Sequence, residues 1–169
     1  MSLGKKDFNR IVNTLVNKGI RDPFKQIIIE YLSGLSRYVN ITNVLLYGSV
    51  ARGKPLLGKS DIDLIVIAKE YDISRDDLFR LKRKIRGKLP GLVESLWMSK
   101  KEFIDVFKGL TGFILDALYE GVILYDEDNF LHELRSRLFK AIEKGVIQRY
   151  KNFWRFPKVV PGKKVNIEI

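Results

Sequence analysis

Apolar residues recur along this chain at two spacings, one typical of helices and the other of buried strands. Apolar positions three and four residues apart predict helices at residues 7–18, 22–38, 74–89, 99–108, 111–120 and 128–144. Short apolar runs bounded by turn residues predict strands at residues 42–47, 61–68, 92–98 and 122–125. Helices and strands therefore alternate, which indicates an α/β (α+β) fold with a sheet flanked by helices.

Capping residues mark several of these boundaries. Asp22 is expected to be the N-cap of the second helix, with Pro23 at its first helical position. Two pairs have the spacing of a capping box, and each is expected to start a helix: Ser74 with Asp77, and Ser99 with Glu102.

The order of the elements predicts how the central strands pair. The strand at 61–68 is apolar on both faces and is therefore expected inside the sheet. The helix at 74–89 forms a crossover between this strand and the strand at 92–98, and such connections join parallel strands. The strand at 42–47 is linked to 61–68 by a compact turn, so the end of one is expected beside the start of the other.

Composition narrows the class of protein. The chain has 169 residues, 46% of them hydrophobic, which is enough for one domain with a core. It has no cysteine, so disulfides and zinc–thiolate sites are excluded, and we expect a cytoplasmic protein. No leader peptide is expected, and no apolar run approaches the roughly 18 residues that a membrane span requires. The net charge of +11 indicates a polyanionic partner, although a basic surface kept for solubility explains it as well.

Two aspartates at the mouth of a buried strand are the strongest chemical signal. Asp61 and Asp63 lead into the run Leu64–Ile67, and alternation along a strand makes them point to the same side. Two desolvated carboxylates repel each other unless a cation or hydrogen-bond donors compensate. Glu94, two residues into the parallel strand, is expected beside Asp63, unless it simply faces solvent. The sequence therefore predicts a metal site of three carboxylates.

The stretch before the aspartates predicts contacts to phosphate. Gly48 would let the backbone approach a phosphate closely, and Ser49 offers a hydroxyl and an amide. Arg52 can bind phosphate through two hydrogen bonds, unless it is a surface cation. Lys59 and Ser60 lie next to the site and are weaker candidates. Residues 53–60 also match the P-loop pattern, but that motif requires a helix after Ser60, and a strand is predicted there.

These residues together resemble the minimal nucleotidyltransferases of the DNA polymerase beta superfamily. That family has an apolar strand, Gly-Ser, a spacer, Asp-x-Asp between apolar residues, and a third carboxylate on a later strand. The corresponding residues here are Gly48-Ser49, Asp61-Ile62-Asp63 and Glu94. At the position of Glu94 the family more often has Asp. The sequence GSVARG…SDID is also similar to that of archaeal CCA-adding enzymes. The resemblance implies a mixed sheet of three to five strands, two Mg²⁺ ions on Asp61, Asp63 and Glu94, and transfer of a nucleoside monophosphate, AMP from ATP, to a hydroxyl.

The resemblance covers about residues 25–125 and leaves the acceptor open. We expect residues 1–127 to form the nucleotidyltransferase domain, and residues 128–169 a C-terminal helix and basic tail packed on it. One alternative is an antitoxin-like binding module that pairs with a small helical HEPN-type protein. A lower-ranked alternative is an RNA-directed, CCA-adding-like enzyme. The segment 149–158 interleaves bases with aromatics, which predicts either RNA or acidic-partner binding or a packed helix with a basic rim.

Overall fold

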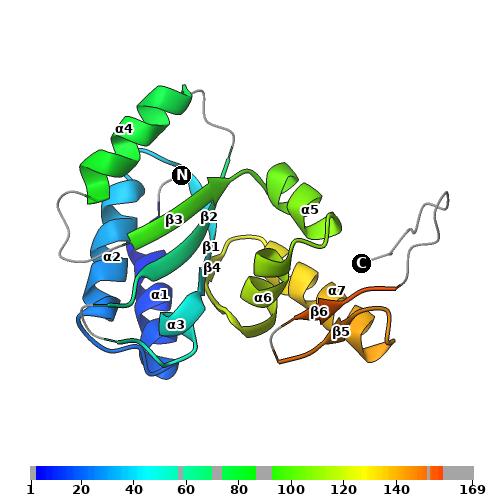
Figure 1. Ribbon diagram of the computed structural model, residues 1–169. Helices are drawn as coiled ribbons and strands as arrows, with labels where there is room; N and C mark the ends of the chain where they lie inside the picture. The colour runs from blue at the N-terminus through cyan, green and yellow to red at the C-terminus, as the bar shows by residue number, and fades with distance from the viewer. Residues whose placement is uncertain (1–2, 57–58, 70–73, 87–92, 152, 158–169) are drawn as a thin grey trace.

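Four strands form one mixed sheet at the centre of the computed structural model, which describes residues 3–56, 59–69, 74–86, 93–151 and 153–157 (Figure 1). The strands are β1 (Ile41–Tyr47), β2 (Ile62–Ala68), β3 (Val93–Met98) and β4 (Val122–Asp126), in the order β3-β2-β1-β4. β1 is antiparallel to both β2 and β4, whereas β2 and β3 are parallel. The predicted strands, the interior place of β2 and the parallel crossover are therefore confirmed.

Helices cover both faces of this sheet (Figure 1). α1 (Lys5–Asn17) and α2 (Phe24–Leu35) pack on one face, where they meet Val44, Leu46 and alternate residues of β2. α5 (Lys100–Lys108), α6 (Gly112–Glu120) and α7 (Phe130–Glu143) pack on the other face, around Leu45 and Ile65. α4 (Arg75–Arg86) lies against α2. Neighbouring residues of one strand point to opposite faces, so the run Val44–Leu46 contributes to two cores.

The predicted second helix is shorter than expected at both ends. It begins at Phe24, with Pro23 rather than Asp22 at the N-cap, and the Asp22 carboxylate instead accepts a hydrogen bond from the Gln26 amide at 3.2 Å. It ends at Leu35 rather than near residue 38, because the following turn buries Val39 in the core before β1. The capping box predicted at Ser99 is present. At Ser74 the hydroxyl accepts a hydrogen bond from the Asp77 amide at 3.1 Å and donates one to the Asp77 carboxylate at 2.7 Å. The side chains whose spacing predicts α4 lie outside the described ones, namely Leu78, Leu81 and Ile85.

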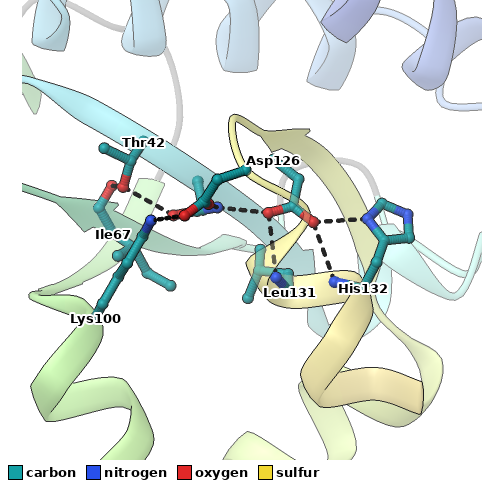
Figure 2. A network of polar contacts seen from close by, with 8 residues as sticks. Thr42, Ile67, Lys100, Asp126, Leu131 and His132 are labelled. Carbon is teal, nitrogen blue, oxygen red and sulfur yellow. Dashed lines mark hydrogen bonds and ion pairs between the residues drawn. The ribbon is translucent and has the colours of Figure 1, made fainter.

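A polar network fixes the start of α7 to the sheet (Figure 2). Asn43 of β1 is fully buried and donates to the carboxylate of Asp126 at 2.5 Å. The same carboxylate accepts from the backbone amides of Leu131 and His132, each at 3.1 Å, so it caps the helix. The exposed His132 ring also contacts it, at 2.6 Å from Nδ1. His132, the lone histidine of the chain, therefore lies on the surface at this cap.

The chain continues past α7 into a short hairpin that was not predicted. Its strands are β5 (Gln148–Arg149) and β6 (Trp154–Arg155). The indole of Trp154 donates to the Asp116 carboxylate on α6 at 2.9 Å, which ties the hairpin to the helical layer. Most of the basic tail predicted within residues 128–169 lies outside the described residues, since the description ends at residue 157. Within the described parts of the chain, no helix has the length and apolar character needed to cross a membrane.

Candidate active site

Three carboxylates meet where β2 and β3 begin. In the parallel register Asp63 lies directly beside Glu94, and Ile62 beside Val93. Adjacent strands are about 4.8 Å apart, and Asp61, one residue before β2, is close enough for its charge to act on Asp63. Asp61 and Asp63 are half-buried, while Glu94 is exposed. The fold therefore brings together all three residues that the sequence selected.

Repulsion within this group acts on the pKa of Asp63. The pKa of Asp63 is raised above its ordinary value, chiefly by burial and then by the charges of Asp61 and Glu94, while Arg52 acts in the opposite direction. The pKa of Tyr47 at the end of β1 is raised as well, by burial first and then by Asp63 and Glu94. The site thus holds excess negative charge that a cation would relieve.

Gly48 is packed against one of these carboxylates. Its φ of +75° lies in the left-handed region that favours glycine, and a Cβ there would stand 2.0 Å from Oδ2 of Asp63. In the turn between β1 and the short helix α3 (Gly48–Ala51), a side chain at this position would displace the Asp63 carboxylate. Ser49, the next residue, is half-buried. The Gly-Ser turn therefore borders the carboxylates, as the sequence predicts.

Arg52 and Glu120 form an ion pair at the rim of this site. The Arg52 guanidinium donates to Oε1 of Glu120, at the end of α6, at 2.7 Å, and both side chains are partly exposed. Nothing in the sequence pointed to Glu120, because it is 68 residues from its partner. The ion pair orients the Arg52 guanidinium, whose positive charge acts on Asp63.

The other two predicted phosphate contacts lie in the loop before β2. Lys59 is exposed. The Ser60 hydroxyl accepts a hydrogen bond from the amide of Leu56 at 2.8 Å, so it supports the loop itself. Residues 57–58 lie outside the described residues. Because β2 follows Ser60 directly, a P-loop is excluded for this segment.

A cavity of about 460 Å³ opens beside Glu94. Its walls come from four elements that are far apart in the sequence, namely Tyr31, Tyr47, Val93, Glu94, Ser95, Leu96 and Phe113. The Tyr31 hydroxyl is hydrogen-bonded to Ser95, which also accepts from the Trp97 indole at 2.8 Å. Sequence reasoning missed Tyr31 and Phe113, since each lies on a helix whose apolar spacing signals only packing. The cavity offers room for a group next to the carboxylates.

The donor set fits a hard divalent cation that is shared with a substrate. Among the residues that the structure describes, no three His, Cys, Asp or Glu side chains are arranged to hold a metal ion by themselves. Magnesium, however, is usually bound by one or two carboxylates together with phosphates of the substrate. Asp61 and Asp63 are two half-buried carboxylates whose charges repel each other, and they meet that requirement.

Comparison with known protein families bears directly on this geometry. The profile of the family described as Polymerase beta, Nucleotidyltransferase matches residues 26–130. The chain belongs to this family. The match includes the whole four-stranded sheet and the three carboxylates, and it confirms the resemblance and the fold predicted from the sequence. The match ends near the start of α7, before the C-terminal hairpin.

The comparison with solved structures gives matches of low sequence identity. One is described as a toxin–antitoxin with AMP-PNP. The two sequences are 14% identical, the alignment covers 81% of this chain and 87% of the other, and the TM-score is 0.43. A second, described as a mutant of the toxin–antitoxin MntA-HpeT, has the same identity and coverages and a TM-score of 0.41. No curated protein sequence matches the chain.

Proposed function

We propose that this protein transfers a nucleoside monophosphate, AMP from ATP, to a hydroxyl group of an acceptor. The observation that carries the proposal is the meeting of Asp61, Asp63 and Glu94 at one end of the sheet of a nucleotidyltransferase family member. The identity of the nucleotide, the metal and the acceptor are parts of this proposal.

Each residue has a distinct role in the transfer. The acceptor oxygen attacks the α-phosphorus of the nucleotide, the bond from that phosphorus to the bridging oxygen breaks, and pyrophosphate leaves. Glu94, exposed beside the cavity, takes the proton of the acceptor hydroxyl. Ser49 and Arg52 bind the triphosphate, with Lys59 and Ser60 beside them.

Asp61 and Asp63 would bind two divalent cations, and Glu94 would complete the site of one of them. Mg²⁺ ions at these positions would supply positive charge to the attacking and leaving oxygens. The absence of a side chain at Gly48 leaves room for the Asp63 carboxylate in its present position.

The test uses the full chain, Mg²⁺, host extract and ATP labelled in turn on the α- and the γ-phosphate. We expect label from the α-phosphate, and not from the γ-phosphate, to become attached to an acceptor. Asp61→Asn and Asp63→Asn should abolish the transfer, whereas Glu133→Gln, an exposed acid on α7, should leave it unchanged. Full activity in either aspartate variant would refute the assigned roles, and the other NTPs, labelled likewise, test the preference for AMP.

The labelled product also separates the acceptors considered for this site. A labelled small helical protein would support the predicted HEPN-type partner as acceptor, and copurification of such a protein without label would support the antitoxin-like binding module. Label at the 3′ end of RNA would support the CCA-adding-like alternative. Mass spectrometry of the labelled material distinguishes these results.

A further inference from the structure

The C-terminal end of the chain carries more than half of its net charge. Residues 144–169 contain seven lysines and arginines and one glutamate, against a net charge of +11 for all 169 residues. The family match ends at residue 130, so this charge lies outside the matched domain. A concentrated cationic segment attracts polyanions.

Exposed aromatic rings lie on the same segment. In the hairpin turn the rings of Tyr150 and Phe153 stack face to face, with centroids 4.7 Å apart and planes 8° from parallel. They remain 40% and 58% exposed. A backbone hydrogen bond from Tyr150 to the carbonyl of Phe153, at 2.9 Å, closes the turn that presents them. Flat apolar faces in water have a free-energy cost that a stacked ligand would remove.

The hairpin is held firmly against α6 and α7 (Figure 1). Arg149 binds the Asp116 carboxylate at 3.1 Å and lies over the rings of Tyr119 and Trp154. Tyr119 in turn packs against the exposed Phe139 of α7, with centroids 5.4 Å apart. A second exposed aromatic group therefore lies on the elements to which the hairpin is tied, on a fixed scaffold.

Cations and a cavity complete this surface. Lys151 and Arg155 are exposed, and neither forms an ion pair with another described residue. A cavity of about 280 Å³ lies between the end of α7 and the hairpin, lined in part by Gln148, Arg155 and Phe156. Its walls thus combine an amide, a guanidinium and an aromatic ring.

We propose that this basic-aromatic surface, formed by Gln148, Tyr150, Lys151, Phe153 and Arg155 of the hairpin, binds single-stranded nucleic acid. Bases stack on the exposed rings, and phosphates pair with the unpartnered cations. An acidic protein would use the cations but leave the stacked rings uncovered, so the aromatic faces favour nucleic acid. Duplexes hide the base faces and are bound less well. This binding does not depend on the proposed nucleotide transfer.

Binding is measured by fluorescence anisotropy with labelled oligouridine and oligodeoxyuridine of twelve nucleotides, the full chain and no free nucleotide. We expect binding at 50 mM salt that weakens steeply toward 200 mM. Comparison of the two oligomers shows whether the sugar contributes. A duplex of the same length and polyglutamate are the competitors, and both should compete poorly.

Two double variants test the two parts of the surface. Tyr150→Ala with Phe153→Ala should weaken binding about tenfold, since stacking on an aromatic ring contributes that much or more per base. The control is Phe79→Ala, which removes an aromatic ring that is 67% exposed on α4. Lys151→Glu with Arg155→Glu should lower the salt slope by about two, whereas Lys5→Glu with Lys6→Glu, exposed on α1, should leave the slope unchanged. Thermal unfolding confirms that each variant is folded.

The proposal is overturned if the wild-type chain fails to bind either oligomer at 50 mM salt. It is overturned equally if loss of both hairpin rings changes affinity no more than Phe79→Ala does. Displacement of the oligomer by polyglutamate as readily as by unlabelled oligomer would show a surface for acidic proteins instead. Equal affinity for the duplex would show that charge alone drives the binding.

Discussion

Replacing Gly48 by alanine separates catalytic geometry from fold stability. The new Cβ would lie 2.0 Å from Oδ2 of Asp63, whereas ordinary contacts begin near 3.4 Å. The carboxylate must therefore move by about 1.4 Å, the difference between these distances. Because it is the end of a side chain, it can rotate away, so the fold survives while the aspartate leaves its position beside Glu94.

The two effects have different expected sizes. A non-glycine residue at a left-handed φ costs about 1–2 kcal/mol. For a chain of this size that lowers the melting temperature by about 2–8 °C. A displacement of about 1 Å in a reacting group can reduce the rate about 100-fold. We therefore expect a folded protein that has lost most of its transfer activity.

Two other glycines provide matched controls. Gly53 has a φ of +68° and Gly19 a φ of +71°, and a Cβ at either position would meet no atom within 4 Å. Alanine at these positions imposes the same backbone strain without the collision. Gly19 lies in the turn after α1, away from the carboxylates, so Gly19→Ala should lower the melting temperature similarly and keep full activity.

The measurements are thermal unfolding and the rate of transfer of the α-phosphate label, for all three variants. If Gly48→Ala were as active as Gly19→Ala, the position of Asp63 beside Gly48 would not matter for the reaction, and the reasoning would be wrong. Unfolding of Gly48→Ala alone would show that the collision is relieved by the backbone rather than by the carboxylate.

Two other substitutions probe charge in the same site. Asp63→Asn should raise the melting temperature by about 2–4 °C at pH 7.5 without Mg²⁺, because it removes repulsion of about 1 kcal/mol. The pKa of Asp63 is raised by folding, so its ionisation opposes the folded state at neutral pH, and the gain should vanish as the pH falls below the ordinary carboxyl pKa of about 4. Glu133→Gln, also loss of an acid from a cationic protein, should give no gain, and a gain of equal size there would contradict local repulsion. Arg52→Lys keeps the charge but loses the planar pair of donors, so ATP binding measured by calorimetry should weaken about tenfold. Unchanged affinity would place Arg52 outside the phosphate site.

Much of the sheet could be predicted from local patterns. The runs at Val44–Leu46 and Leu64–Ile67 are buried on both sides, and burial of that kind leaves an apolar signature in any fold. The capping box at Ser99 likewise depends on residues three apart. The end of α2 was less predictable, because the turn that buries Val39 is set by where β1 must begin.

The carboxylates were predictable for a related reason. Asp61 and Asp63 are close in sequence, and strand alternation alone puts them on one side. Glu94 followed from the handedness and direction of crossover connections, which are nearly invariant. By contrast, the Arg52–Glu120 pair depends on how α6 docks against the sheet, and no local rule specifies that docking.

By itself, the sequence determined the strands, the direction of β3, and a nucleotidyltransferase motif whose acidic residues could be named. Only the tertiary structure decided that Gly48 lies close to the Asp63 carboxylate, and that Phe113 and Tyr31 border a cavity beside Glu94. It also decided that the final basic segment forms a hairpin with exposed stacked rings. Periodicity records whether a side chain is buried, but it does not record which distant side chain it meets. That choice is made when the helices pack on the sheet.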